Sequence, residues 1–287
     1  MNYHGKNIGY RACAKIAKTK FLVDKNYFYG ILAAVMELLR ITFENAKLKG
    51  IWHFSLPSGW SCPGAKNCKT FADRETGKIT DKQVEVDGVE IRCYAAMDEA
   101  RRSNVRKIRW DNFDLLKQCK SLKDYVDLIS ASVAHEMPAV GGFLRVHVGG
   151  DYFKYIYLKA WLTVAALFPK ITFYSYTKSI HLLARYLNEE NELPPNFAFT
   201  CSTGGKFDKL IPETKVKTAT IFFSQDEIDA LGLEVDHTDG LAISSSKSFA
   251  LLLHGCQKKG SKASEALKGL KQQGFKGYNA SRNVSHK

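Results

Sequence analysis

The sequence predicts an α/β protein with a partial or complete parallel βα barrel, similar in layout to a TIM barrel. Short apolar strands alternate with helical segments through the second half of the chain, and this alternation indicates a parallel sheet with helices on its faces. Polar or glycine-containing segments follow most of these strands, as expected where such folds carry their sites. The 287 residues are enough for one large domain or two small ones. An open, doubly wound sheet is the alternative.

The first half of the chain supplies an N-terminal extension, one strand and a polar insertion. Apolar side chains recur at helical spacing over residues 26–49, which predicts a helix after a basic N-terminal segment. The alternating residues 51–56 predict the first strand, which opens into a loop of turn-forming residues at 57–64. Residues 69–92 are polar and predict an insertion after the first strand, and 93–116 returns to helical spacing.

The second half predicts the remaining strands, each short and apolar, with helices expected at 155–168 and 180–187. The expected strands are 142–148, 171–176, 197–200, 218–223 and 249–253. Because the carboxyl ends of parallel strands lie at one edge of a sheet, the polar residues that follow these strands should meet there.

The charge of the chain favours a polyanionic partner. Lys and Arg number 42 against 29 Asp and Glu, so the formal net charge is +13, which makes nucleic acid a plausible partner. Arg101, Arg102 and Arg106 lie close together in the helix predicted after the insertion and are candidate phosphate contacts, although a solvated helix face would look the same. No apolar run is long enough to span a bilayer, and no signal peptide is visible, so we expect a cytoplasmic protein.

Three of the seven cysteines are placed to bind a metal. Cys62 and Cys68 lie in the loop after the first strand, and Cys93 begins the helix that follows the insertion. Three thiolates can hold a [4Fe–4S] cluster and leave its fourth iron free for substrate or cofactor. The same thiolates with His53 could instead complete a tetrahedral zinc site. Unrelated loop thiols are the third alternative.

A glycine-acid motif follows the second strand. By alternation, Arg145 and His147 share one strand face, and Gly149-Gly150-Asp151 comes next. The paired glycines would let the backbone approach a bound molecule, and Asp151 could accept hydrogen bonds from an amino group. A turn with a helix-capping Asp is the alternative interpretation.

Three further residues follow strands and should face the same end of the sheet: Lys178, Cys201 and His254. Lys178 could bind a carboxylate or phosphate. A surface lysine, a buried free thiol and a core histidine are the plainer interpretations of the three.

Several strings resemble a phage-encoded family named after gene product 88. They are Cys62-Pro63-Gly64-x3-Cys68, Ala72-Asp73-Arg74-x-Thr76-Gly77, Arg92-Cys93-x-Ala95-Ala96, His147-Val148-Gly149-Gly150-Asp151-Tyr152, Tyr176-Thr177-Lys178-Ser179 and Leu253-His254-Gly255. The resemblance spans about residues 50 to 278 and implies a phage or mobile-element origin, but no reaction. The chain is also distantly similar to radical S-adenosylmethionine enzymes, partial barrels with a three-cysteine loop and a Gly-Gly-acid motif, although its cysteines are more widely spaced.

These observations predict an iron–sulfur enzyme that acts on a nucleic acid or nucleotide, by radical S-adenosylmethionine-like or non-redox lyase or desulfidase chemistry. Gly149, Gly150 and Asp151 would hold the ligand, for which S-adenosylmethionine is a candidate. Lys178 and His147 would fix its polar end or move a proton. The alternative is a non-catalytic basic nucleic-acid-binding protein stabilised by zinc or a cluster.

The expected organisation has three parts. Residues 1–50 form a basic segment and helix, 51–257 form the barrel-like iron–sulfur domain, and 258–287 form a basic C-terminal helix and tail.

Overall fold

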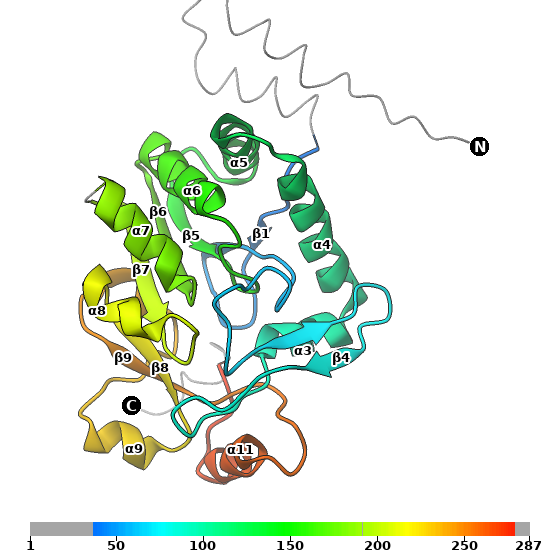
Figure 1. Ribbon diagram of the computed structural model, residues 1–287, viewed down its shortest axis with the longest axis vertical. Coiled ribbons are helices and arrows are strands. Elements are labelled where there is room, and N and C mark those ends of the chain that lie inside the picture. Colours follow the sequence, from blue (N-terminus) through cyan, green and yellow to red (C-terminus); the bar gives the residue numbers. More distant parts are fainter. Residues whose placement is uncertain (1–36, 191, 279–287) are drawn as a thin grey trace, which may run out of the picture.

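The fold is an α/β arrangement around one open, mostly parallel sheet (Figure 1). A computed structural model describes residues 37–190 and 192–278. The sheet has seven strands in the order β1-β2-β5-β6-β7-β8-β9. The strands are β1 (Thr42–Phe43), β2 (Ile51–Phe54), β5 (Gly142–Val146), β6 (Ile171–Thr177), β7 (Phe197–Ser202), β8 (Thr218–Phe222) and β9 (Phe249–Leu252).

The strand order follows the chain order, which excludes the doubly wound alternative because that topology reverses direction along the sheet. β1 pairs with β2 antiparallel, and every later pair in this sheet is parallel. No closed barrel forms in the described residues, so a complete barrel, one of the two predicted forms, is wrong. The outer edge of β9 is instead covered by Val235, which bridges to Ala250. The backbone N–H and carbonyl groups of Ala250 are thereby engaged with residues 234 and 236.

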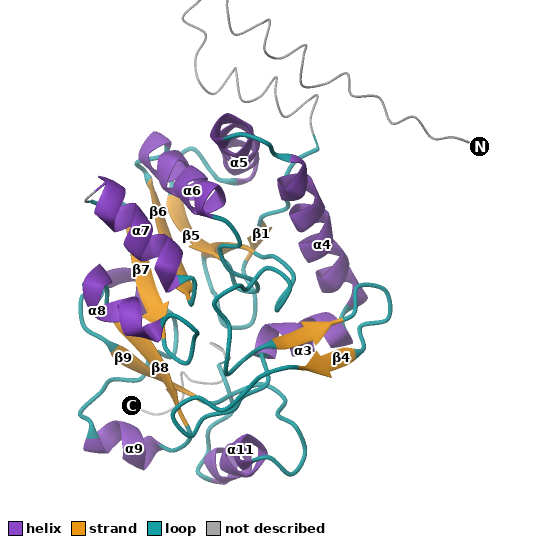
Figure 2. Cartoon of the chain, viewed as in Figure 1, coloured by secondary structure: helices purple, strands orange, loops and turns teal. Residues whose placement is uncertain are grey.

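The helices pack around the sheet, and several of them lie together along one of its faces (Figure 2). They are α3 (Tyr94–Arg101), α4 (Ser103–Gln118), α5 (Leu122–Glu136), α6 (Tyr155–Leu167), α7 (Ile180–Glu190), α8 (Ile211–Thr214), α9 (Gln225–Ala230), α10 (Gly240–Ser244) and α11 (Lys262–Gln272). The predicted helix over 93–116 is divided into α3 and α4 at Arg102, whose backbone is extended. The polar insertion forms a hairpin of β3 (Thr70–Ala72) and β4 (Ile79–Asp81) that contacts α3.

Two apolar layers lie on opposite faces of the sheet. On β6, Phe173 belongs to the large cluster that includes Trp161 of α6, whereas Tyr174 belongs to a smaller cluster with Ala242 of α10. The alternation of side chains along the strand produces this division. The face that carries Tyr174 also carries Arg145, since the two residues are partners in adjacent strands.

The helix predicted over residues 26–49 is corrected in its described part. Residues 26–36 lie outside the described residues, and residues 37–49 form β1 and a turn rather than a helix. The backbone N–H groups of Leu39 and Arg40 donate to the side chains of Ser132 and Asn112, at 2.9 and 2.7 Å. These contacts hold the segment extended against α5 and α4.

The C-terminal part agrees with the predicted helix as far as it is described. α11 begins at Ser261, whose hydroxyl accepts from the Ser264 backbone at 3.2 Å, and its Leu267 and Leu270 are buried. Residues 279–287, predicted as a tail, lie outside the described part, as do residues 1–36 of the basic N-terminal segment. No described helix is long and apolar enough to cross a membrane.

A candidate metal centre in a cavity at the strand ends

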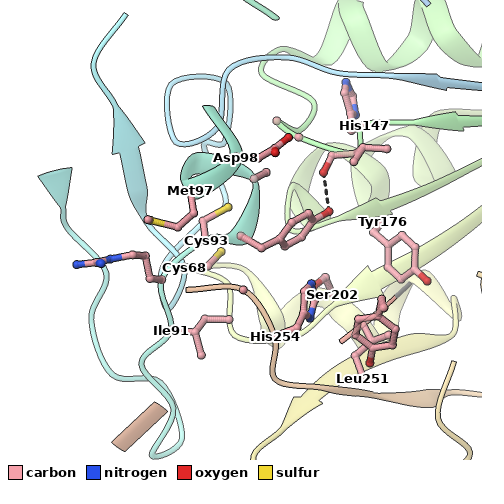
Figure 3. A pocket seen from close by; sticks show the side chains of 18 of the residues that line it. Cys68, Ile91, Cys93, Met97, Asp98, His147, Tyr176, Ser202, Leu251 and His254 are labelled. Atoms are coloured by element: carbon pink, nitrogen blue, oxygen red, sulfur yellow. Dashed lines mark hydrogen bonds between the residues drawn. The ribbon is translucent and has the colours of Figure 1, made fainter. Parts of the chain in front are cut away.

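A cavity of about 460 Å³ lies at the carboxyl ends of the parallel strands. Its lining brings together the three cysteines of the predicted metal site with residues that follow separate strands, as the parallel topology predicts. The sequence-predicted residues that line it are Cys62, Cys68, Cys93, Arg101, Arg102, His147, Gly149, Gly150, Asp151, Lys178 and His254. In Figure 3, Cys68 and Cys93 lie on one side of the cavity, and Tyr176 and Leu251 on the other.

The loop that carries Cys62 and Cys68 lies across the ends of β6 and β7. A Cβ atom on Gly64 would come within 1.9 Å of the Lys178 carbonyl oxygen, so only glycine allows the loop to approach β6 this closely. Ala65 bridges to Gly205, which follows β7. The Lys69 ammonium donates to the carbonyl oxygen of Cys62 at 2.7 Å. These contacts fix the loop on the strand ends.

Cys93 is held beside this loop by a buried ion pair. Arg109 of α4 donates from Nη1 to Glu99 Oε1 at 2.6 Å, and Glu99 lies on α3, which starts directly after Cys93. The same carboxylate oxygen accepts from the Ser58 backbone at 3.0 Å and from its hydroxyl at 2.8 Å. Glu99 and Arg109 are both buried. One carboxylate thus joins α3, α4 and the loop that leads to Cys62.

Burial makes all three thiols weaker acids than usual. It raises the pKa of Cys93 to about 11 and raises the pKa values of Cys62 and Cys68. The charges of Cys93 and Cys68 raise the pKa of Cys62 further, whereas the charge of Lys178 opposes the rise at Cys68. The thiols therefore lie close enough to affect one another's ionisation. Each is protonated at neutral pH without a metal, and metal binding must displace the protons.

The described residues contain no group of side chains already arranged around a single metal ion. In the described part of the chain, no three His, Cys, Asp or Glu side chains are grouped so that they could hold one metal ion. Three sulfurs on one zinc ion must lie about 3.8 Å apart, given zinc–sulfur bonds of about 2.3 Å in a tetrahedron. In a cluster each thiolate binds its own iron atom, so the sulfurs are more widely separated. All six described cysteines are free thiols.

His53 is not placed to complete a zinc site with these cysteines. Its Nε2 lies 3.2 Å from the carbonyl oxygen of Glu44, in the turn after β1, and it does not line the cavity. Burial lowers the pKa of His53 to about 4, so its ring is neutral at neutral pH.

The glycine-acid motif packs tightly against the neighbouring chain segments. A Cβ atom on Gly150, whose φ is +85°, would come within 2.6 Å of Leu56 and of Ser61, and one on Gly149 within 2.8 Å of Arg109. The close approach that requires these glycines is therefore to the cysteine loop and to α4. Both glycines also line the cavity, so the expectation that they let the backbone approach a bound molecule stays a prediction.

Asp151 is already saturated with donors from its own chain. One carboxylate oxygen accepts from the Tyr152 backbone and from the Thr177 hydroxyl, both at 2.7 Å, and the other accepts from the backbones of Lys178 at 2.9 Å and Ser179 at 3.1 Å. Burial raises the pKa of Asp151, and these hydrogen bonds oppose the rise. Asp151 thus fastens the end of β5 to the end of β6, which leaves little capacity for a ligand amine.

His147 does not share a face with Arg145, contrary to the expectation from alternation. β5 ends at Val146, and His147 has a φ of +70°, which interrupts the strand geometry. Its Nε2 lies 2.9 Å from the Tyr157 hydroxyl, and its Nδ1 has no hydrogen-bond partner among the residues that the structure describes. Burial lowers the pKa of His147 to about 3, so the ring is neutral at neutral pH and is not placed to act as a proton carrier there.

The remaining strand-end residues divide into two groups. Lys178 is buried, lines the cavity, and donates from Nζ to the Ser202 hydroxyl at 3.1 Å and to the carbonyl oxygen of Thr203. His254 also lines the cavity. Cys201 does not: its buried Sγ lies 3.7 Å from the Thr214 hydroxyl of α8, on the other face of the sheet. The expectation that Cys201 approaches the site is therefore wrong.

The three candidate phosphate-binding arginines also separate. Arg101 and Arg102 are exposed and line the cavity. Arg106 is buried, and its guanidinium donates to the carbonyl oxygens of Arg74, Glu99 and Glu75 at 2.9, 2.5 and 3.0 Å. Arg106 fastens the hairpin turn to α3, and because it is buried and three of its five N–H groups are engaged, it is poorly placed to meet a phosphate on the surface.

Sequence reasoning missed two buried polar groups that shape the site. One is the Glu99–Arg109 pair. The other is Asp239, which pairs with Arg145 at 2.6 Å. A partner for Arg145 was foreseeable, because a buried arginine on a strand needs one. Its identity was not, since Asp239 is distant in sequence and lies in an irregular loop.

The fold and the cavity together define an α/β protein that carries a three-thiol site at the carboxyl ends of parallel strands. The chain belongs to the Gene product 88 family, whose family model matches residues 31–272. The resemblance inferred from the sequence strings is thus confirmed. No curated protein and no solved structure matches the chain.

Proposed function

We propose that the protein is an iron–sulfur enzyme of phage or mobile-element origin that acts on a nucleic acid or nucleotide. In this proposal the open sheet is a partial βα barrel, and Cys62, Cys68 and Cys93 hold a [4Fe–4S] cluster at its mouth. The observation that carries the proposal is that Cys93 and the loop pair Cys62 and Cys68, all free thiols, line one cavity at the strand ends.

A cluster bound by three thiolates supplies an iron atom with an open coordination position, which can bind and polarise a ligand or transfer an electron. Lys178 assists by its charge, which opposes the rise in the pKa of Cys68 that burial causes and so favours the thiolate that binds iron. Asp151, Gly149 and Gly150 act as positioning residues. Asp151 accepts a hydrogen bond from the backbone of Lys178, and the two glycines allow the close packing against the cysteine loop and α4. S-adenosylmethionine is a candidate ligand, because a cavity of about 460 Å³ suits molecules of its size.

Nucleic acid or a nucleotide is the proposed substrate class because of charge. The formal net charge is +13, and the exposed Arg101 and Arg102 stand at the cavity. Arg102 is partly engaged by Asp98 at 2.9 Å, whereas Arg101 has no ion pair within the described residues. A phosphate that enters the cavity would meet these side chains first.

The test is the metal content of anaerobically purified protein. We expect a brown protein with broad absorbance near ~400 nm that contains iron and sulfide. Cys62→Ser, Cys68→Ser and Cys93→Ser should each lose most of the iron. The matched control is Cys119→Ser, which removes a buried thiol outside the cavity and should keep it.

Two outcomes would overturn the proposal. A colourless protein with one zinc ion would favour the alternative, a zinc-stabilised nucleic-acid-binding protein without catalysis. Iron that persists in all three cysteine variants would mean that these thiols are not its ligands. Cys256→Ser is a useful further variant, because Cys256 lines the same cavity and loss of iron there would indicate a fourth thiolate.

A further inference from the structure

A second cluster of charged side chains lies at the wall of the cavity, on the sheet face that carries Tyr174. The carboxylate of Asp239, which is completely buried, pairs with Arg145 Nη1 at 2.6 Å and with Lys47 Nζ at 2.5 Å. The Tyr174 hydroxyl donates to the same carboxylate at 3.0 Å. Lys47 and Arg145 both line the cavity, together with Tyr176.

The charges in this group do not balance. Two cations share one carboxylate, and Asp239 stays ionised because Arg145 and Lys47 lower its pKa to about 2 despite its burial. The neighbouring Asp236 is turned to other partners, since its carboxylate accepts from the backbones of Thr238 at 3.1 Å and Ala242 at 3.0 Å. Arg145 is buried and the Lys47 side chain is 19% exposed, so this largely buried group carries a net positive charge that an anion in the cavity would compensate.

Donor groups also remain available. Arg145 is 7% exposed, and its Nε has no hydrogen-bond partner within the described residues. Its Nη2 makes only a long contact of 3.4 Å with the Tyr94 hydroxyl. Lys47 has three N–H donors, of which its contact with Asp239 accounts for one. The pair therefore has donors to spare beside an open space.

Aromatic rings surround these cations. The Arg145 guanidinium lies 4.7 Å from the centre of the Tyr176 ring, and the Lys47 ammonium 4.5 Å from that of Tyr278. His254 packs between Tyr94 and Tyr278, with ring centres 4.9 and 4.8 Å apart. Burial lowers the pKa of His254 to about 4, so it adds no charge at neutral pH. Rings of this kind offer stacking surfaces for a nucleobase.

The rest of the lining reinforces the positive character. The acids that line the cavity are Asp98, which pairs with Arg102, and Asp151, which is saturated by its own chain. The cations that line it are Lys47, Arg92, Arg101, Arg102, Arg145 and Lys178.

We propose that Lys47 and Arg145 form a binding site for a phosphate group of the molecule that occupies this cavity. The site goes beyond the iron–sulfur proposal, because it requires no metal. The phosphate can come from a nucleotide or from free inorganic phosphate. The aromatic walls favour the nucleotide, whose base would stack while its phosphate meets the two cations.

The test is calorimetric titration of metal-free protein with inorganic phosphate, adenosine monophosphate and adenosine. We expect adenosine monophosphate to bind more tightly than phosphate, and adenosine to bind weakly. Lys47→Met should weaken the binding of adenosine monophosphate about tenfold or more, the effect of losing one charge-assisted hydrogen bond. The matched control is Lys49→Met, since Lys49 is exposed, lies outside the cavity and contacts Glu44 at 3.7 Å. It should leave affinity unchanged.

Asp239→Asn supplies a test with the opposite sign. Because it removes the competing carboxylate, it should tighten binding of adenosine monophosphate, provided that circular dichroism shows a folded variant. The proposal is overturned if neither phosphate nor adenosine monophosphate binds at millimolar concentration, or if Lys47→Met binds as the wild type does. These results do not depend on iron, so the failure of one proposal is distinguishable from the failure of the other.

Discussion

Glu99→Gln should destabilise the protein strongly, because it breaks the buried pair that joins the two cysteine-bearing segments. Glu99 is 0% exposed and Arg109 4%, and Nη1 and Oε1 lie 2.6 Å apart. Removal of one partner leaves the other charge buried and uncompensated, which typically costs 3–5 kcal/mol. Asp98 lies 3.4 Å from Arg109 and can take over part of the pairing. We therefore expect the lower figure, about 3 kcal/mol of the free energy of unfolding.

The assay is urea denaturation with a thermal melt as a second measurement. A loss of about 3 kcal/mol corresponds to a fall of about 6–12 °C in the melting temperature of a domain of this size. The control is Asp127→Asn, which breaks an exposed pair with Lys123 on α5 and should cost less than about 1 kcal/mol. The double variant Glu99→Leu with Arg109→Met should recover much of the stability, because no charge remains buried.

The reasoning is refuted if Glu99→Gln loses no more stability than Asp127→Asn does. In that case the ion pair does not hold α3 to the cysteine loop. If the pair does hold them, Glu99→Gln should also take up less iron than the wild type at a temperature where both are folded, because Cys93 is no longer fixed beside Cys62.

Three further predictions concern other parts of the molecule. Gly64→Ala should destabilise the protein and reduce iron uptake, because its Cβ atom would come within 1.9 Å of the Lys178 carbonyl oxygen. The control is Gly269→Ala in α11, where a Cβ atom would have nothing within 4 Å and should do no harm. Equal melting temperatures for the two variants would contradict this prediction. The free energy of unfolding should fall as the pH drops from about 6.5 towards 4, by at most about 1.4 kcal/mol per pH unit for each buried histidine. The reason is that these histidines bind protons in the unfolded chain but stay neutral in the native protein. A free energy of unfolding, measured with urea, that does not change between pH 7 and 5 would contradict the prediction. The histidines concerned, with their lowered pKa values of about 4, 3 and 4, are His53, His147 and His254. Any binding of single-stranded nucleic acid should weaken steeply as the salt concentration rises. The double variant Arg101→Ala with Arg102→Ala should reduce the slope of log affinity against log salt concentration. Arg106→Ala should lower the stability of the protein instead.

The layout of the sheet could be predicted from the sequence because its signals are local. Each strand after β1 is a short apolar run, and a parallel sheet fixes the side on which all their carboxyl ends lie. That rule alone brings the cysteine loop, Lys178 and His254 to one cavity. Closure of a barrel is a different matter, because it depends on whether the edge strands meet. Here Val235 covers the edge of β9 instead.

The roles of individual side chains were harder to predict, because they depend on contacts between distant segments. His147 leaves the face of Arg145 through a single positive φ angle, which no periodicity reveals. Arg106 looks like any exposed basic residue of a helix until the hairpin turn supplies three carbonyl oxygens for it. Asp151 was correctly placed at the strand end, but its donors come from the neighbouring strand.

The most direct test of the metal centre is anomalous diffraction at the iron edge from crystals of anaerobically purified protein. The account predicts a cluster of iron atoms in which a different iron lies within bonding distance, about 2.3 Å, of the sulfur atom of each of Cys62, Cys68 and Cys93. A signal at the zinc edge instead, or iron bound away from any of these three sulfurs, would contradict it.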